Sequence, residues 1–159
     1  YYSIIDGKTV GPFATGTACA ALVAGATKEV SDMMYDFGTE FGRAFQLVDD
    51  LLDLTGDPEM GKPRGTDVHE GKMTLPIIHA LTILHGSERE HLADVLNNFS
   101  DDRWNELTTL LEISGSFSYT RQLIQNHVDR ALEIISNLPS SDAKDLISEV
   151  ALISRNRKV

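Results

Sequence analysis

The feature that most constrains the fold is a helical repeat of apolar side chains over residues 31–54. These side chains recur at every third or fourth position, at Met34, Phe37, Phe41, Phe45, Val48 and Leu52. This spacing places them on one side of an α-helix, whereas a half-buried strand requires strict alternation of apolar and polar residues. No segment of the sequence alternates in that way. We therefore expect an all-α protein.

Other segments also carry helical patterns. Residues 8–26 are rich in Ala, Gly and Thr, so this predicted helix should pack closely against a neighbour, with its regular part starting or bending at Gly11 and Pro12. Thr74 is the expected cap of a helix whose first turn holds Pro76, where proline is tolerated. Ser87 and Glu90 have the spacing of a capping box. Further helices are predicted over residues 101–114, 116–138 and 141–155.

Composition limits the classes of partner. The 159 residues show no linker or repeat, so we expect one all-α unit over residues 1–159. A net charge of −10 argues against nucleic acid, which is bound by basic surfaces. The longest apolar run, residues 18–26, is shorter than the roughly 20 residues that span a bilayer, so no transmembrane segment is expected. Cys19 is the single cysteine, expected to be buried, and its lack of a partner for an intrachain disulfide suits a cytoplasmic protein.

The end of the long helix gathers negative charge. Asp49 and Asp53 lie one helical turn apart, about 6 Å, and Asp50 lies about 100° around the helix from Asp49. These carboxylates repel one another, and a shared cation would relieve the repulsion. Mg²⁺ suits such a position because it typically binds one or two carboxylates together with phosphate oxygens and water. A solvated acidic helix end is the alternative.

A long polar loop follows, over about residues 56–73. It contains several glycines and the basic residues Lys62, Arg64 and Lys72. Loops of this length inside a compact domain are usually functional or mobile. Carboxylates, a hard cation and flexible lysines together describe a diphosphate-binding site.

The same region resembles the trans-isoprenyl diphosphate synthases, the farnesyl and geranylgeranyl diphosphate synthase family of polyprenyl synthetases. The resemblance is carried by the segment GRAFQLVDDLLDLTGDPEMGKPRGTDVHEGKMTLPII, by a Lys8-Thr9 pair and by Gly25-Ala26. The family pattern is a G-x-x-F-Q-x-x-D-D-x-x-D helix, a G-K-x-x-G-x-D loop and a G-K-x-T-L-P helix start. The fold it implies is the C-terminal half of the isoprenoid synthase helical bundle.

The resemblance also implies roles for individual residues. Asp49 would bind Mg²⁺ directly, and Asp50 and Asp53 would assist. The allylic diphosphate would be contacted by Lys8, Lys62 and Lys72. Thr9 and Gln46 would line the reacting end, and Asp67 would anchor the loop.

The reaction it implies is a Mg²⁺-dependent prenyl transfer. An allylic diphosphate would be condensed with isopentenyl diphosphate to a longer all-trans isoprenyl diphosphate, with preorganised charge stabilising the leaving group. The family is generally homodimeric, so a homodimer is expected of the full-length protein.

Only one aspartate-rich motif is present, whereas the family uses two, and the sequence begins with Tyr1 rather than methionine. We therefore expect a catalytically incomplete fragment of a longer synthase. One alternative is a non-catalytic regulatory subunit of a complete prenyl diphosphate synthase. A class I terpene cyclase would need Asn or Asp, Ser or Thr, and Glu where this sequence has Asp49, Asp53 and Asp57. A helical scaffold without a ligand is the remaining alternative.

Overall fold

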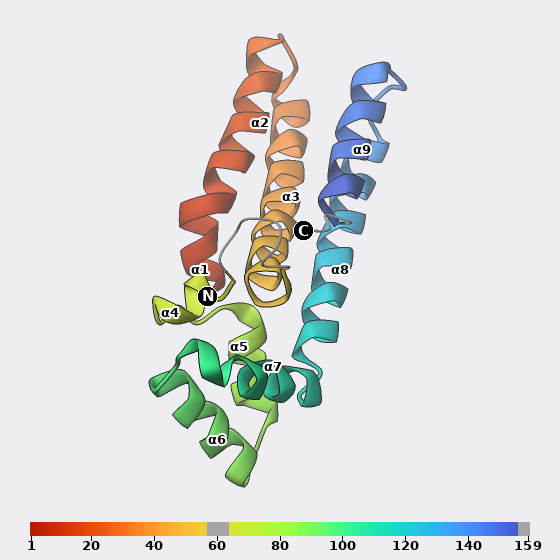
Figure 1. Ribbon diagram of the computed structural model, residues 1–159. Helices are drawn as coiled ribbons and strands as arrows, with labels where there is room; N and C mark the ends of the chain where they lie inside the picture. Colours follow the sequence, from red (N-terminus) through yellow and green to blue (C-terminus); the bar gives the residue numbers. More distant parts are fainter. Residues whose placement is uncertain (57–63, 156–159) are drawn as a thin grey trace. The chain divides into compact units, whose positions relative to one another are not determined.

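Figure 1 shows the computed structural model, which describes residues 1–56 and 64–155. Every regular element within these ranges is a helix, so the all-α prediction is confirmed. In chain order they are α1 (Tyr2–Ile5), a π-helical turn (Asp6–Val10), α2 (Gly11–Val23), α3 (Lys28–Thr55), α4 (Thr66–His69), α5 (Leu75–Ile83), α6 (Gly86–Asn97), a 3-10 turn (Asp101–Arg103), α7 (Trp104–Ile113), α8 (Ser116–Ser136) and α9 (Asp142–Arg155).

The chain divides into two compact units. The long-helix unit contains residues 2–48 and 123–155, and the short-helix unit contains Tyr1 with the described part of Asp49–Gln122. Helices α3 and α8 each contribute to both units. A single all-α domain over residues 1–159 stays a prediction.

In the long-helix unit, α2 lies directly against α3 (Figure 1). Gly38 on α3 makes the contact possible, because a Cβ atom there would lie 2.7 Å from the Cα of Ala14. One turn further on, a Cβ at Gly42 would lie 3.0 Å from the Cα of Val10. The Thr17 hydroxyl also donates a 2.6 Å hydrogen bond to the main-chain oxygen of Met34. The expected close packing of this small-residue helix is thereby confirmed.

Aromatic residues of α3 form the core of the same unit. Phe37 and Phe41 are buried with Ala131 and Ile135 of α8 and Ala151 of α9. Phe13 of α2 meets Phe41 edge-on, with ring centroids 5.2 Å apart. The part of the predicted apolar stripe from Met34 to Phe45 therefore faces three other helices. Within the whole stripe, Phe37, Phe41 and Val48 are buried, and the other three members are half-buried.

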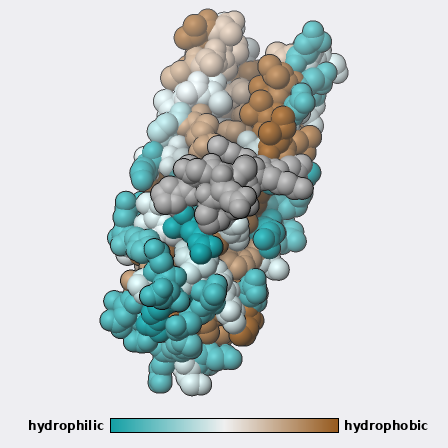
Figure 2. Space-filling view, viewed as in Figure 1, coloured by the Kyte–Doolittle hydropathy of each residue, from teal (hydrophilic) through white to brown (hydrophobic). Residues whose placement is uncertain are grey.

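In the short-helix unit, α5, α6 and α7 pack against one another. Fully buried aliphatic side chains hold them together, namely Ile77, Leu92, Val95, Leu107 and Leu111. Figure 2 shows mostly hydrophilic side chains on the visible face of this unit. On the long-helix unit, the same view shows hydrophobic side chains at the end of α2 and near α9, where Leu22, Val23, Leu146 and Ile153 are exposed.

Several local expectations need correction. The helical run expected over residues 8–26 begins already at Tyr2, because a π-helical turn at Asp6–Val10 joins α1 to α2 without a break. The polar loop contains the short helix α4. Thr74 occupies the position before α5 but makes no capping bond. The capping box at Ser87 is wrong, because α6 starts one residue earlier, at Gly86.

The expectation of a buried cysteine is also wrong, because Cys19 is exposed on α2. None of the helices in the described ranges combines the length and apolarity that a bilayer-crossing segment requires.

The π-helical turn is tied to α3 by an ion pair. Arg43 donates two hydrogen bonds to the carboxylate of Asp6, at 3.0 and 2.8 Å. The hydrogen bond from Arg43 is the main reason why the pKa of Asp6 lies below its ordinary value. A carboxyl whose pKa is lowered by folding stabilises the folded state when ionised, and this contribution disappears as the pH falls through the folded-state pKa.

We therefore expect Asp6→Asn to lower the free energy of unfolding at pH 7 by about 0.5 kcal/mol, a small value because the pair is partly exposed. The difference from wild type should shrink as the pH falls below 3.8, the ordinary pKa. Urea unfolding at pH 7 and at low pH measures both values. Asp36→Asn, on the exposed side of α3, is the matched control and should change little. An unaltered difference at low pH would contradict the ionic origin.

Candidate metal and diphosphate site

The three aspartates near the end of α3 are not a solvated acidic surface. Asp50 is only 3% exposed, and Asp49 and Asp53 are half-buried. Helix α3 continues two residues beyond Asp53, and Gly56 closes it with a 2.7 Å hydrogen bond to the main-chain oxygen of Leu52. Removing carboxylates from water is costly unless they are compensated. The burial of the triplet therefore favours a role over ordinary surface charge.

The cost of burying the Asp50 carboxylate is offset by a hydrogen bond from Tyr1. The hydroxyl of Tyr1 donates a hydrogen bond to Oδ2 of Asp50. Sequence analysis missed this contact because no local pattern links two residues that are 49 positions apart. Its consequence is that Asp50 is oriented by a neutral donor, which suits an assisting rather than a direct role at a cation.

Asp53 connects α3 to the far end of the polar loop. Its main-chain oxygen accepts a 2.8 Å bond from the N–H of Gly65, and its Oδ2 accepts a 3.1 Å bond from the N–H of Asp67. Burial raises the pKa of Asp53 above its ordinary value, and the nearby charges of Asp67 and Asp49 add to this, while hydrogen bonds from the main-chain N–H groups of Asp67 and Thr66 offset only part of the rise. An ionised Asp53 is therefore held in an unfavourable place that a cation would relieve.

Asp67 continues this chain of contacts to Lys72. The Lys72 ammonium lies 2.8 Å from Oδ1 of Asp67 and 2.6 Å from Oε2 of Glu70. The main-chain N–H of Lys72 also donates to the main-chain oxygen of Asp67, at 2.8 Å. The Lys72 ammonium donates hydrogen bonds to the carboxylates of Asp67 and Glu70, and these bonds, chiefly the one to Asp67, raise its pKa so that it stays charged. Lys72 would have to leave or share these partners to contact a diphosphate.

The donor chemistry of this region fits Mg²⁺. Within residues 1–56 and 64–155, no group of three or more His, Cys, Asp or Glu side chains is arranged to hold a metal ion. Mg²⁺ does not need three such side chains, since it keeps water and takes phosphate oxygens beside one or two carboxylates. Asp49 and Asp53 provide hard oxygen donors, and their mutual repulsion would be lowered by such an ion.

The residues predicted for the reacting end lie in the long-helix unit. Thr9, in the π-helical turn, donates a 2.7 Å hydrogen bond from Oγ1 to Oε1 of Gln46 on α3. Both side chains are half-buried, and Lys8 beside them is exposed. The structure thus brings Thr9 and Gln46 together although they are 37 positions apart. Lys62 lies outside the described residues.

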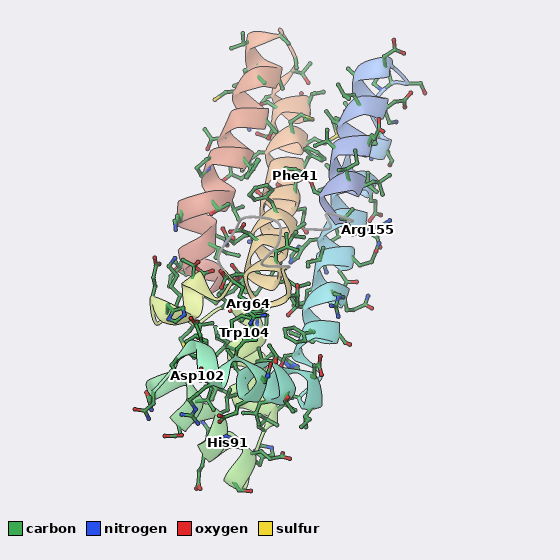
Figure 3. All side chains as sticks on the ribbon, viewed as in Figure 1. Phe41, Arg64, His91, Asp102, Trp104 and Arg155 are labelled. Carbon is green, nitrogen blue, oxygen red and sulfur yellow. The ribbon has the colours of Figure 1, made fainter. Side chains whose placement is uncertain are left out.

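Two further residues lie at the turn that bonds to Asp53 through Gly65. Arg64 has no separate role in the sequence-based prediction, and Trp104 is not singled out by it. Arg64 places its guanidinium carbon 4.8 Å from the ring centre of Trp104, the first residue of α7 (Figure 3). Trp104 is the only tryptophan. No local pattern marks it, because it reaches the loop only through the packing of α7.

The chain is similar in sequence to prenyl diphosphate synthases. The sequence model of the polyprenyl synthetase family matches residues 1–112. The short chain isoprenyl diphosphate synthase of Methanothermobacter thermautotrophicus is 33% identical over 95% of this chain and 47% of its own length. The octaprenyl diphosphate synthase of Escherichia coli is 34% identical over 99% of this chain and 49% of its own length.

Solved structures of prenyl diphosphate synthases also match the fold of this chain. A polyprenyl synthase from Caulobacter crescentus, complexed with calcium and isoprenyl diphosphate, superposes with a TM-score of 0.92 at 30% identity, covering 100% of this chain and 49% of that one. This chain belongs to the polyprenyl synthetase family. It spans about half the length of these relatives. Its helices have the fold of the trans-prenyl diphosphate synthases, as the resemblance implied.

Proposed function

We propose that the whole protein is a trans-prenyltransferase that condenses an allylic diphosphate with isopentenyl diphosphate. The observation that carries this proposal is the half-buried Asp53, whose negative charge is opposed by burial and by Asp67 and Asp49. The charged form of Asp53 remains disfavoured although main-chain N–H groups bond to its carboxylate, so a cationic ligand is the natural reason for this residue. The chain's membership of a family of prenyl diphosphate synthases supports the same chemistry.

Mg²⁺ would be held by Asp49 directly, with Asp50 and Asp53 assisting, and it would supply positive charge to the departing diphosphate. Lys8, Lys62 and Lys72 would contact the diphosphate oxygens, Lys72 after releasing Asp67 or Glu70. Asp67 would keep the loop against Asp53 through its main-chain N–H. The Thr9 and Gln46 pair would place oxygen atoms beside the developing allylic cation, where partial negative charge is favourable.

Thermal unfolding with inorganic pyrophosphate tests the binding part. We expect Mg²⁺ and pyrophosphate together to raise the melting temperature of the chain, because a ligand at 100 times its Kd stabilises the folded state by about 2.7 kcal/mol. Chelating the metal, or the substitution Asp49→Asn, should remove the rise. If adding the two ligands leaves the melting temperature unchanged, the proposed site is refuted and a ligand-free scaffold is favoured.

The catalytic part is tested in the protein as its gene encodes it. Allylic and isopentenyl diphosphates with Mg²⁺ should yield longer prenyl diphosphates, while the 159 residues alone should yield none because the family uses a second aspartate-rich motif. Full activity of the 159-residue chain would contradict its being a part of the catalytic unit. We propose that the whole protein is a cytoplasmic homodimer, on the family resemblance, and light scattering measures the oligomeric state.

The alternative is a non-catalytic subunit that regulates a complete synthase. The single aspartate-rich motif of this chain favours it. That alternative predicts no product from the encoded protein alone and a changed rate or product length when it is added to a complete prenyl diphosphate synthase.

A further inference from the structure

Trp104 stands at the centre of an aromatic cluster in the short-helix unit. The cluster consists of Trp104, Arg64, Phe99 and His69. Trp104 is 7% exposed, and the Arg64 guanidinium covers its ring at 4.8 Å (Figure 3). Phe99 meets Trp104 edge-on at 6.1 Å and His69 edge-on at 4.9 Å between ring centres. His69 is held in turn by Asp101, at 3.0 Å.

The indole ring also presses directly against Gly65. A Cβ atom at Gly65 would lie 2.4 Å from Cζ3 of Trp104, so no other side chain fits while the ring stays in place. Gly65 has a φ of +71°, which is a left-handed conformation that glycine adopts without strain. Trp104 therefore forms the wall against which this turn of the chain is set.

The turn set by Trp104 is the one that contacts Asp53. The N–H of Gly65 donates to the main-chain oxygen of Asp53, and the N–H of Asp67, two residues later, donates to its Oδ2. Asp53 therefore has one carboxylate oxygen fixed by the turn. A displacement of Gly65 would move both donors at once, since only Thr66 separates them along the chain.

We propose that Trp104 is a positioning residue of the metal and diphosphate site, acting on Asp53 through Gly65. This inference rests on the proposed function of the Asp49, Asp50 and Asp53 triplet. Some residues do not bind a metal themselves but orient the carboxylates that do. Removing such a residue typically weakens metal affinity by about 10- to 100-fold. Because the ring of Trp104 contacts Gly65, its effect on Asp53 passes through the shape of the turn.

The test uses the 159-residue chain. Trp104 is its single tryptophan, so its fluorescence reports directly on this residue. Calorimetric titration with pyrophosphate at saturating Mg²⁺ gives the Kd. We expect Trp104→Leu to raise this Kd by about tenfold. Trp104→Phe, which keeps an aromatic ring but lacks the fused ring system that walls Gly65, should fall between Trp104→Leu and wild type. The matched control is Leu92→Ala. Leu92 is fully buried on α6, in the same unit but outside the cluster. This substitution should change the Kd less than twofold, even if it lowers the melting temperature.

Fluorescence gives the second measurement and needs no variant. Adding Mg²⁺ and pyrophosphate to the wild-type chain should shift the emission of Trp104, and EDTA should reverse the shift. Wild-type binding with an unchanged emission would overturn the positioning role, as would an unchanged Kd in the folded Trp104 variants. If Trp104→Leu does not fold, the Kd of Trp104→Phe and the emission of the wild-type chain test the positioning role. A wild-type chain that binds no pyrophosphate would instead refute the proposed function, and this inference with it.

Discussion

Replacing Asp53 with asparagine is expected to stabilise the ligand-free chain while removing its response to Mg²⁺ and pyrophosphate. Burial and the charges of Asp67 and Asp49 oppose the ionised form of Asp53. Asparagine keeps an oxygen that can accept the 3.1 Å bond from the N–H of Asp67. Because Asp53 is only half-buried and its charge is partly screened by solvent, the substitution should raise the free energy of unfolding by only about 0.5 kcal/mol.

The same substitution removes a charge that a metal would use. The rise in melting temperature with Mg²⁺ and pyrophosphate, worth about 2.7 kcal/mol at 100 times the Kd, should largely vanish. Asp102→Asn is the control, because Asp102 is an exposed carboxylate of the same unit (Figure 3). It should leave stability nearly unchanged and the ligand response intact. A ligand response that survives in Asp53→Asn would exclude Asp53 from the metal site.

Gly38→Ala is expected to destabilise the chain by about 2 kcal/mol, because overpacking of a tight contact typically costs 1–3 kcal/mol. The added Cβ would lie 2.7 Å from both the Cα of Ala14 and the main-chain oxygen of Phe13. These are backbone atoms of α2, so a change of side-chain rotamer cannot relieve the clash. The two helices would have to separate, and the bond from Thr17 to Met34 would be lost with the contact.

Gly16→Ala provides the matched control. Gly16 lies inside α2, and a Cβ there would meet no atom within 4 Å. Alanine should stabilise the helix by roughly 0.5–1 kcal/mol, because it costs less conformational entropy than glycine. Urea unfolding of the two variants should therefore give effects of opposite sign. Equal effects would show that backbone freedom, rather than the contact of α2 with α3, decides the role of Gly38.

The family resemblance and the all-α fold could be predicted because their signals are local. The apolar positions from Met34 to Leu52 repeat at the spacing that one helix needs. The aspartates and glycines match the family pattern in linear order, so the candidate roles of Asp49, Asp53 and Gln46 needed no coordinates. The capping box at Ser87 failed because α6 begins one residue earlier, with His85 at the cap position and no side-chain capping bond.

The non-local parts of the site could not be predicted. Tyr1 bonds to Asp50 across 49 positions, and Thr9 bonds to Gln46 across 37. The contact between Trp104 and Gly65 likewise depends on where α7 packs in its unit. Such contacts depend on which faces of two helices meet. The spacing of apolar side chains within one helix does not indicate which other helix packs against it.

The amino-acid sequence by itself determined that α3 is a helix, that its carboxylates are crowded and that this chemistry suits a cation and a diphosphate. Backbone hydrogen bonding and side-chain spacing act within a few residues, so their pattern can be seen in the linear order. Only the tertiary structure decided that Asp50 and Asp53 are withdrawn from water, and that Tyr1, Gly65 and Asp67 hold them. Burial depends on contacts between segments far apart along the chain, and those exist only once the helices have packed.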